Sequence, residues 1–144
     1  MNFEPKKTDK AAFVALWHNN ELLVLQSRKW RSEGTPYLLP GGGCKSDETL
    51  EDCVIRELCE ECSQILFRTY LEYFGRESTQ WSNCHFYEYI IRPDNYGMDE
   101  PIVLEDKLFG YEWWNFEEDK LRIQALKSFM MPGLKWYLEQ KGLL

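Results

Sequence analysis

Most of the chain divides into short apolar segments that are separated by polar residues, glycine or proline. Residues 11–17 and 21–27 are two such segments, and the polar His18-Asn19-Asn20 between them predicts a β-hairpin. Aromatic and β-branched residues predict further strands at 37–39, 65–74, 84–92 and 109–114. Polar residues with glycine or proline predict loops at 29–36 and 93–101.

Residues 50–62 have the spacing of an amphipathic helix. Thr49 is a suitable N-cap, with Asp52 three residues later in a capping-box position. A helical projection gives an apolar face, expected to pack on a sheet, that consists of Val54, Ile55, Leu58, Cys59 and Cys62. The opposite face carries Arg56, Glu57, Glu60 and Glu61.

A second helix is expected at residues 133–141, with Pro132 at or near its first position. The helices and strands together predict an α/β fold in which a mixed sheet lies between helices. The length of 144 residues fits a single domain, residues 1–144, that is large enough to bury a core. The hydrophobic content of 44% and aromatic content of 15% exclude a disordered chain.

The net charge of −7 argues against a nucleic-acid polymer as the partner, because the sequence contains no basic stripe. The same charge is compatible with a nucleotide whose phosphates bind together with a metal ion. No apolar run approaches the roughly 18 residues of a membrane span, so no membrane association is expected. Residues 1–10 are polar and lack the apolar core of a signal peptide, and the cytoplasm is therefore the expected location.

The chain contains five cysteines, an odd number, and has no secretion signal, so reduced thiols are expected. Cys59 and Cys62 form a Cys-x-x-Cys pair, and His85 follows Cys84, which makes a zinc site an alternative. Zinc needs four converging ligands, whereas the two helix cysteines lie on the apolar face. Packing in the core is the favoured interpretation for both.

The polar face of the helix at 50–62 concentrates carboxylates. Glu57 and Glu61 lie one turn apart and repel each other, so the cluster is costly without a cation. Mg²⁺ prefers oxygen ligands and commonly bridges to substrate phosphates. The alternative is an acidic face exposed to solvent, which is the usual fate of charged helix faces. The glycine run 41–43 favours the metal interpretation, because glycines let the backbone approach an ion or a phosphate closely.

The spacing of these residues resembles the Nudix box, the signature of the Nudix hydrolases. Its fixed positions are filled by Gly42, Glu48, Arg56-Glu57 and Glu60-Glu61, and the box asks for an apolar residue where Leu58 stands. The segment from Gly42 to Gln64 departs from the pattern at its end, where Ser63 replaces a glycine and Gln64 an aliphatic residue. Ser63 is expected to end the helix in the left-handed conformation that glycine adopts most easily.

The resemblance implies an α/β/α sandwich and the hydrolysis of the pyrophosphate linkage in a nucleoside diphosphate derivative, with Mg²⁺ or Mn²⁺ as the cofactor. It implies metal ligation by the carboxylates of Glu57, Glu60 and Glu61 and by the carbonyl oxygen of Gly41. The general base in such enzymes comes either from the box, here Glu57 or Glu60, or from a later loop, here Glu105.

Other residues are expected to support the reaction. Arg56 is expected to orient the catalytic glutamates, and Glu48 to pair with Arg56 and fix the loop; the alternative for Glu48 is simple electrostatics at the helix start. Gly42 and Gly43 are expected to let the substrate phosphates approach the backbone. Arg28, at the end of the second strand, is a candidate ligand for a phosphate.

The expected substrate is a (deoxy)nucleoside triphosphate or a modified nucleotide, because residues that mark other substrate classes of the family are absent downstream of the box. Trp30, Tyr37, Trp81 and Trp113 are candidates for stacking on a base, although such aromatics more often belong to the core. The partner is this small molecule, and a homodimer is left open. The alternative function is a Nudix-like regulatory domain that senses a nucleotide without turnover, but the intact glutamates favour an enzyme.

Overall fold

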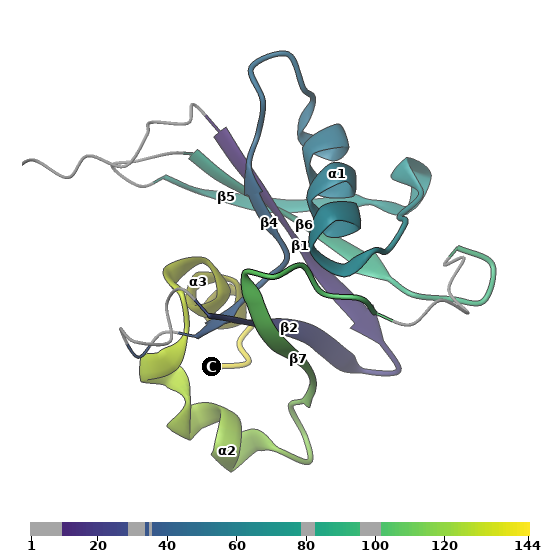
Figure 1. Ribbon diagram of the computed structural model, residues 1–144. Coiled ribbons are helices and arrows are strands. Elements are labelled where there is room, and N and C mark those ends of the chain that lie inside the picture. Colours follow the sequence, from purple (N-terminus) through teal and green to yellow (C-terminus); the bar gives the residue numbers. More distant parts are fainter. Residues whose placement is uncertain (1–9, 29–33, 35, 79–82, 96–101) are drawn as a thin grey trace, which may run out of the picture.

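The computed structural model of the chain describes residues 10–28, 34, 36–78, 83–95 and 102–144. A mixed seven-stranded sheet lies between α1 (Leu50–Cys62) on one face and α3 (Pro132–Gln140) on the other (Figure 1). The strands are β1 (Lys10–His18), β2 (Glu21–Ser27), β3 (Tyr37–Leu38), β4 (Gly41–Gly43), β5 (Glu72–Ser78), β6 (Asn83–Ile90) and β7 (Leu108–Asn115). The predicted α/β/α sandwich with a mixed sheet is therefore confirmed.

Strand β1 is the centre of the sheet. It runs parallel to β6 along its whole length, and β6 continues antiparallel into β5. On its other edge β1 pairs with two partners, first with β4 at its start and then with β2 at its end, both antiparallel. Strand β2 in turn pairs with β3 and β7. This arrangement brings the three glycines of β4 into the sheet beside the first residues of β1.

The hairpin of β1 and β2 forms where the sequence predicted it. Its turn is made by Asn19 and Asn20, with φ angles of 50° and 64°. Two consecutive positive φ angles match the two-residue turns that fit the twist of a hairpin, and asparagine tolerates them better than most residues.

Helix α1 has the predicted bounds and both predicted ends. The Thr49 side chain accepts a hydrogen bond from the backbone N–H of Asp52 at its start. Ser63 stands at its end with φ 57° and ψ 37°, the left-handed conformation, and its N–H donates to the carbonyl of Cys59. The backbone therefore leaves the helix at Ser63 although the residue is not glycine.

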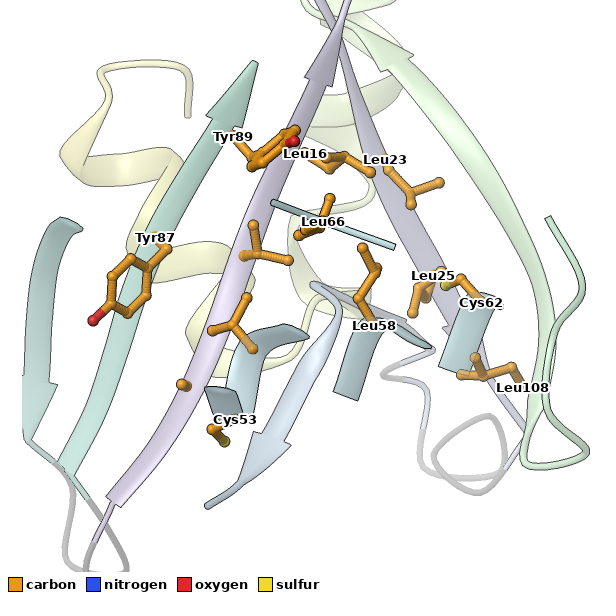
Figure 2. Packing of buried hydrophobic residues seen from close by; sticks show 13 residues of the cluster. Leu16, Leu23, Leu25, Cys53, Leu58, Cys62, Leu66, Tyr87, Tyr89 and Leu108 are labelled. Carbon is orange, nitrogen blue, oxygen red and sulfur yellow. The ribbon is translucent and has the colours of Figure 1, made fainter. Parts of the chain in front are cut away.

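Two apolar clusters fill the two sides of the sheet. Figure 2 shows the cluster on the α1 side, where Leu58 and Cys62 of the helix pack with Leu25 of β2 and Leu108 of β7. On the α3 side the cluster includes Trp114 and several residues of the C-terminal region. Within the described part of the chain, no helix has the length and apolarity that crossing a lipid bilayer requires.

The strand predicted at 65–74 is wrong in its first half. Residues Arg68–Tyr70 form a single 3₁₀ turn, and β5 begins only at Glu72. In the connection between α1 and β5, Gln64 and Leu66 are buried, while Ile65 and Phe67 are 61% and 46% exposed. This alternation of burial stops at the 3₁₀ turn, whose three residues are all exposed, and so the apolar run does not continue as one strand.

Two further elements were not predicted. The short helix α2 (Lys120–Ala125) covers the sheet with a single buried residue, Ile123, so its apolar periodicity is too weak to read. The glycine run was expected to be a loop, yet it forms strand β4 because its backbone pairs with β1. Most of the predicted loop at 29–36 and most of that at 93–101 lie outside the described residues.

Candidate metal and phosphate site

Strand β4, which we call the glycine turn because it leads into α1, has no room for a side chain at Gly41 or Gly42. Gly41 has a φ of +143°, and a Cβ on it would lie 2.3 Å from the carbonyl oxygen of Ala12. A Cβ on Gly42 would lie 2.9 Å from Oε1 of Glu57. A side chain at Gly41 would have to displace the backbone of β1, and one at Gly42 would have to displace the carboxylate of Glu57 on α1. Glycine at these two positions therefore lets β4 lie close to both elements.

Glu57 and Glu61 point inward from α1 toward this turn. Glu61 is 1% exposed and Glu57 8% exposed. One carboxylate oxygen of Glu61 accepts a hydrogen bond of 2.7 Å from the backbone N–H of Gly41. Burial raises the pKa of Glu61 to about 8 and also raises the pKa of Glu57. The two carboxylates are therefore held in a place where their charges are costly without a cation.

The helical projection was correct for Val54, Leu58 and Cys62, which are fully buried, but it was wrong at the edges of the apolar face. It placed the glutamates opposite the apolar face and put Cys59 in the core, whereas Cys59 is exposed and Glu57 and Glu61 are buried. The difference arises because α1 is covered on two sides. The sheet covers its apolar face, and β4 together with the segment around Glu105 covers the neighbouring side that carries Glu57 and Glu61. Cys62 is buried as expected.

Arg56 connects the glycine turn to three carboxylates. Its guanidinium forms two hydrogen bonds to Glu48, of 2.7 and 3.0 Å, and one of 3.1 Å to the carbonyl of Gly43. It also contacts Glu57 at 3.2 Å and Glu60 at 3.1 Å. These bonds lower the pKa of Glu48 to about 2, with Arg56 as the main cause. The geometry fixes Arg56 as a bridge between the turn and the helix.

Glu48 is further tied to its own loop. Its carboxylate accepts the N–H of Lys45 at 3.0 Å, and its backbone carbonyl accepts a hydrogen bond of 2.6 Å from Lys10 Nζ. Glu60 differs from its neighbours, because its side chain is 51% exposed and has Arg56 as its ion-pair partner. The three box glutamates on α1 are thus not equivalent: Glu57 and Glu61 are buried against β4, and Glu60 faces outward.

The segment that carries Glu105 crosses the C-terminal end of α1. The N–H of Glu105 donates to the carbonyl of Glu61 at 3.1 Å, and the N–H of Val103 donates to that of Cys62 at 3.2 Å. Glu105 forms an ion pair of 3.0 Å with Lys107. Sequence reasoning placed Glu105 here only through the family resemblance and missed Lys107, since a single lysine in a loop carries no pattern.

Arg28 lies beside this segment. Its N–H donates to the carbonyl of Lys107 at 3.0 Å, and its side-chain Nε donates to the carbonyl of Leu108 at 3.2 Å. The remaining guanidinium nitrogens belong to an exposed side chain. Arg28 therefore stands next to the residues that face Glu57 and Glu61, but part of its hydrogen-bonding capacity is used by the backbone.

The cysteines do not behave as the sequence predicted. Cys44 and Cys53 form a disulfide with a Cα–Cα distance of 5.3 Å, which corrects the expectation of five reduced thiols. The pair was not recognisable from the sequence because the two residues meet only when β4 folds back on α1. Cys59, Cys62 and Cys84 are not part of this disulfide.

Among the described residues, Cys44, Glu48 and Cys53 also bring possible ligand atoms within 4.8 Å of one another. This group does not offer a second metal site. The two sulfur atoms are joined to each other, and Glu48 is occupied by Arg56.

The four aromatic residues that were candidates for stacking on a base do not form one cluster among the described residues. Tyr37 packs on Trp114, with ring centroids 5.2 Å apart, and Trp113 lies edge-on to His18 at 6.0 Å. Trp30 and Trp81 lie outside the described residues. The stacking of a base on any of the four stays a prediction.

The donor set around the turn fits a hard divalent cation. The donors are the carboxylate oxygens of Glu57 and Glu61, which face the glycines of β4. Mg²⁺ and Mn²⁺ prefer such ligands and bind the deprotonated carboxylate. A cation here would offset the unfavourable free energy of burying the two negative charges of Glu57 and Glu61.

A mixed sheet between helices, with a glycine turn leading into a carboxylate-bearing helix, is the architecture of the Nudix hydrolases. The family model described as the NUDIX domain matches residues 7–136, and the chain belongs to this family. Its members are generally pyrophosphohydrolases of nucleoside diphosphate derivatives, and they generally use a divalent metal. No curated protein matches the sequence.

Solved structures share the fold at low sequence identity. A putative Nudix hydrolase family member from Chromobacterium violaceum is 16% identical, with a TM-score of 0.67, and the match covers 96% of this chain and 79% of that one. A MutT/Nudix family protein from Enterococcus faecalis is 23% identical, with a TM-score of 0.60 and coverage of 80% and 46%.

A third neighbour is a bifunctional NMN adenylyltransferase/ADP ribose pyrophosphatase from Francisella tularensis, complexed with AMP and a Mn ion. It is 18% identical, with a TM-score of 0.66, and the match covers 98% of this chain and 43% of that one. The chain thus spans less than half the length of the Enterococcus and Francisella proteins.

Proposed function

We propose that the chain hydrolyses the pyrophosphate linkage of a (deoxy)nucleoside triphosphate or modified nucleotide, with Mg²⁺ or Mn²⁺ held by Glu57 and Glu61. The observation that carries this proposal is the burial of both carboxylates against a glycine turn that has no side chains. The absence of side chains on the glycines lets their backbone lie directly against the two carboxylates that would hold the cation. The Francisella neighbour, which this chain matches over 43% of its length, is a complex with AMP and a Mn ion.

Each residue then has a role that follows from its contacts. Glu57 and Glu61 bind the cation together with the carbonyl of Gly41, and Arg56 keeps Glu57 oriented through its contact of 3.2 Å. Glu60 is a third ligand only after its exposed side chain leaves Arg56. Glu48 keeps Arg56 in place through their two hydrogen bonds.

The reaction is the attack of water on a phosphorus atom, which forms one P–O bond while the bridging P–O bond breaks. A bound divalent cation neutralises charge on the phosphate oxygens and lowers the pKa of a bound water. Glu105 accepts the proton of the attacking water in this proposal, with the box glutamates Glu57 and Glu60 as the alternative bases. Gly42 and Gly43 admit the phosphates to the backbone, and Arg28 contacts an outer phosphate.

The test is phosphate and pyrophosphate release from a panel of nucleoside triphosphates, modified nucleotides and nucleoside diphosphate derivatives with Mg²⁺ or Mn²⁺. Turnover of at least one compound that stops in excess chelator is the expected result. Turnover that persists in chelator contradicts the metal-dependent mechanism. Tight nucleotide binding without turnover across the whole panel favours the regulatory alternative.

A further inference from the structure

Lys10 holds both ends of the entry loop, residues 44–49, which leads from the glycine turn to α1. Its backbone carbonyl accepts the N–H of Cys44 at 3.0 Å, at the start of this loop. Its Nζ donates a hydrogen bond of 2.6 Å to the backbone carbonyl of Glu48, near the end of the loop. Lys10 is itself fixed in the sheet, because it pairs with Asn83 of β6. One residue of β1 therefore determines where the entry loop lies against the sheet.

Within the entry loop, two hydrogen bonds join Lys45 and Glu48. The N–H of Lys45 donates to Oε1 of Glu48 at 3.0 Å, and the N–H of Glu48 donates to the carbonyl of Lys45 at 3.1 Å. These bonds set the shape of the loop but do not attach it to the rest of the molecule. The disulfide attaches its first residue, Cys44, to α1. The bond from Lys10 Nζ attaches the other end, at Glu48, to β1.

The side chain of Glu48 connects this end of the loop to a candidate metal ligand. Its carboxylate accepts two hydrogen bonds from Arg56, of 2.7 and 3.0 Å. The same guanidinium lies 3.2 Å from Oε1 of Glu57, the buried carboxylate that faces Gly42. Hydrogen bonds of this kind orient metal-ligating carboxylates, and their loss commonly weakens metal binding. Direct contacts thus run from Lys10 to Glu57 without a gap.

We propose that Lys10 is a positioning residue of the metal site and acts on Glu57 through Glu48. The proposal rests on the proposed function and extends the site to a residue outside the segment from Gly42 to Gln64. Lysine suits this role, because its long stem reaches the loop from the sheet and its ammonium group forms a strong, charge-assisted hydrogen bond. A lysine that only stabilises the fold would lower the free energy of unfolding when removed, but its removal would leave the metal affinity of the folded protein unchanged.

The first measurement is amide hydrogen exchange in the metal-free protein. Lys10→Met keeps the apolar stem and removes the donor, so the Glu48 amide is expected to exchange about tenfold faster, while that of Leu58 in the middle of α1 stays unchanged. Lys10→Arg keeps a charged donor and is expected to exchange at close to the wild-type rate. Lys120→Met removes an exposed lysine on α2 and is the matched control. Unchanged exchange at Glu48 in Lys10→Met overturns the proposal.

The second measurement is calorimetric titration of the same four proteins with Mn²⁺ alone. Lys10→Met is expected to bind Mn²⁺ about tenfold more weakly than the wild type, the lower end of the losses that follow removal of such supporting bonds. Lys10→Arg is expected to stay within about threefold of the wild type, and Lys120→Met to be unchanged. Equal or tighter Mn²⁺ binding by Lys10→Met overturns the proposal.

A double-mutant cycle with Glu48→Gln tests the route by which Lys10 acts. Glu48→Gln keeps the backbone carbonyl that Lys10 contacts but weakens the charged bonds to Arg56. If Lys10 acts through these bonds, adding Lys10→Met to the Glu48→Gln variant lowers its Mn²⁺ affinity by less than about twofold. The same loss of affinity in both backgrounds shows that the two residues act independently, and the proposal is then wrong.

These experiments separate this inference from the proposed function. If the wild-type protein binds no Mn²⁺, the metal site itself is wrong and the role of Lys10 fails with it. If the wild type binds Mn²⁺ and Lys10→Met binds it equally well, only the role of Lys10 fails.

Discussion

At the scale of single residues, burial distinguishes carboxylates that are neighbours in sequence. Glu60 and Glu61 are adjacent, yet Glu60 has a half-exposed side chain on Arg56 while Glu61 is 1% exposed against Gly41. A charge that is half exposed is screened by water, whereas a buried one needs a specific partner. We therefore expect these glutamates to respond differently to substitution.

Glu57→Gln and Glu61→Gln are each expected to lower kcat by at least about two orders of magnitude, because a lost ligand misplaces the metal and the water together. The metal-free variants should fold, since an uncharged amide removes a buried charge at nearly constant shape. Steady-state kinetics with the substrate found in the panel check this, and Glu118→Gln, an exposed acid outside the site, is the control. Near-normal turnover by either variant contradicts the assignment.

The pH dependence of stability follows from Glu61. Burial raises its pKa from the ordinary value of 4.5 to about 8, so the folded protein binds more protons than the unfolded chain between these values. The free energy of unfolding of the metal-free protein therefore falls as the pH rises through this window. Thermal melts in EDTA across the window measure the trend. Glu61→Gln is expected to show a smaller fall in melting temperature across this pH range. An equally steep fall in that variant would show that another group causes the pH dependence.

Ser63 tests the cost of a left-handed residue at the end of α1. Ser63→Ala keeps the strained backbone and loses the hydrogen bond of 3.2 Å from the Ser63 hydroxyl to the carbonyl of Val103. Ser63→Gly loses the same bond but relieves the strain, so the glycine variant should be more stable than the alanine variant by about 1 kcal/mol. Denaturant midpoints decide the order. An alanine variant as stable as the glycine variant would show that the backbone at residue 63 carries no strain.

At the scale of elements, three kinds of bond join α1 to β4 and to Cys44, the residue that follows β4. The disulfide of Cys44 and Cys53 is covalent, Arg56 bridges the turn and the helix with charge, and Glu61 accepts the N–H of Gly41. The first of these bonds responds to redox conditions, and the other two do not. Their contributions can therefore be separated experimentally.

Reduction of the disulfide is expected to lower the free energy of unfolding by about 2.5 kcal/mol, the chain-entropy value for a closed loop of about ten residues. Guanidinium midpoints with and without dithiothreitol measure this effect. The double variant Cys44→Ser with Cys53→Ser is the control, because its midpoint should not depend on the reductant. A wild-type midpoint that is the same in both conditions contradicts a stabilising role for the bond.

At the scale of the whole molecule, the sequence predicted those elements whose signals are local. The hairpin of β1 and β2 and helix α1 with both its caps were predicted correctly, because turn residues, capping residues and periodicity lie within the elements themselves. The strand β4 was not predicted, since a glycine run becomes a strand only through pairing with β1.

The candidate site was predictable to the extent that it lies in one continuous segment. The spacing of the box identified Glu57, Glu60 and Glu61, but the sequence did not show which of them are buried. Their burial depends on β4 and on the segment around Glu105, which comes more than forty residues after α1 begins. The disulfide and the charge of Lys107 depend on the same long-range contacts and could not be predicted for the same reason.

The segment around Glu105 is attached to α1 through main-chain atoms, from the N–H groups of Val103 and Glu105 to the carbonyls of Cys62 and Glu61. Such bonds do not depend on which side chains the segment carries, provided that it contains no proline at the donor positions. Substitution of side chains other than Glu105 can therefore leave the segment in its place beside the buried glutamates. The backbone fixes where the segment lies, and the side chains can differ without moving it. The segment is accordingly a place where the surroundings of the buried glutamates can change while the fold does not.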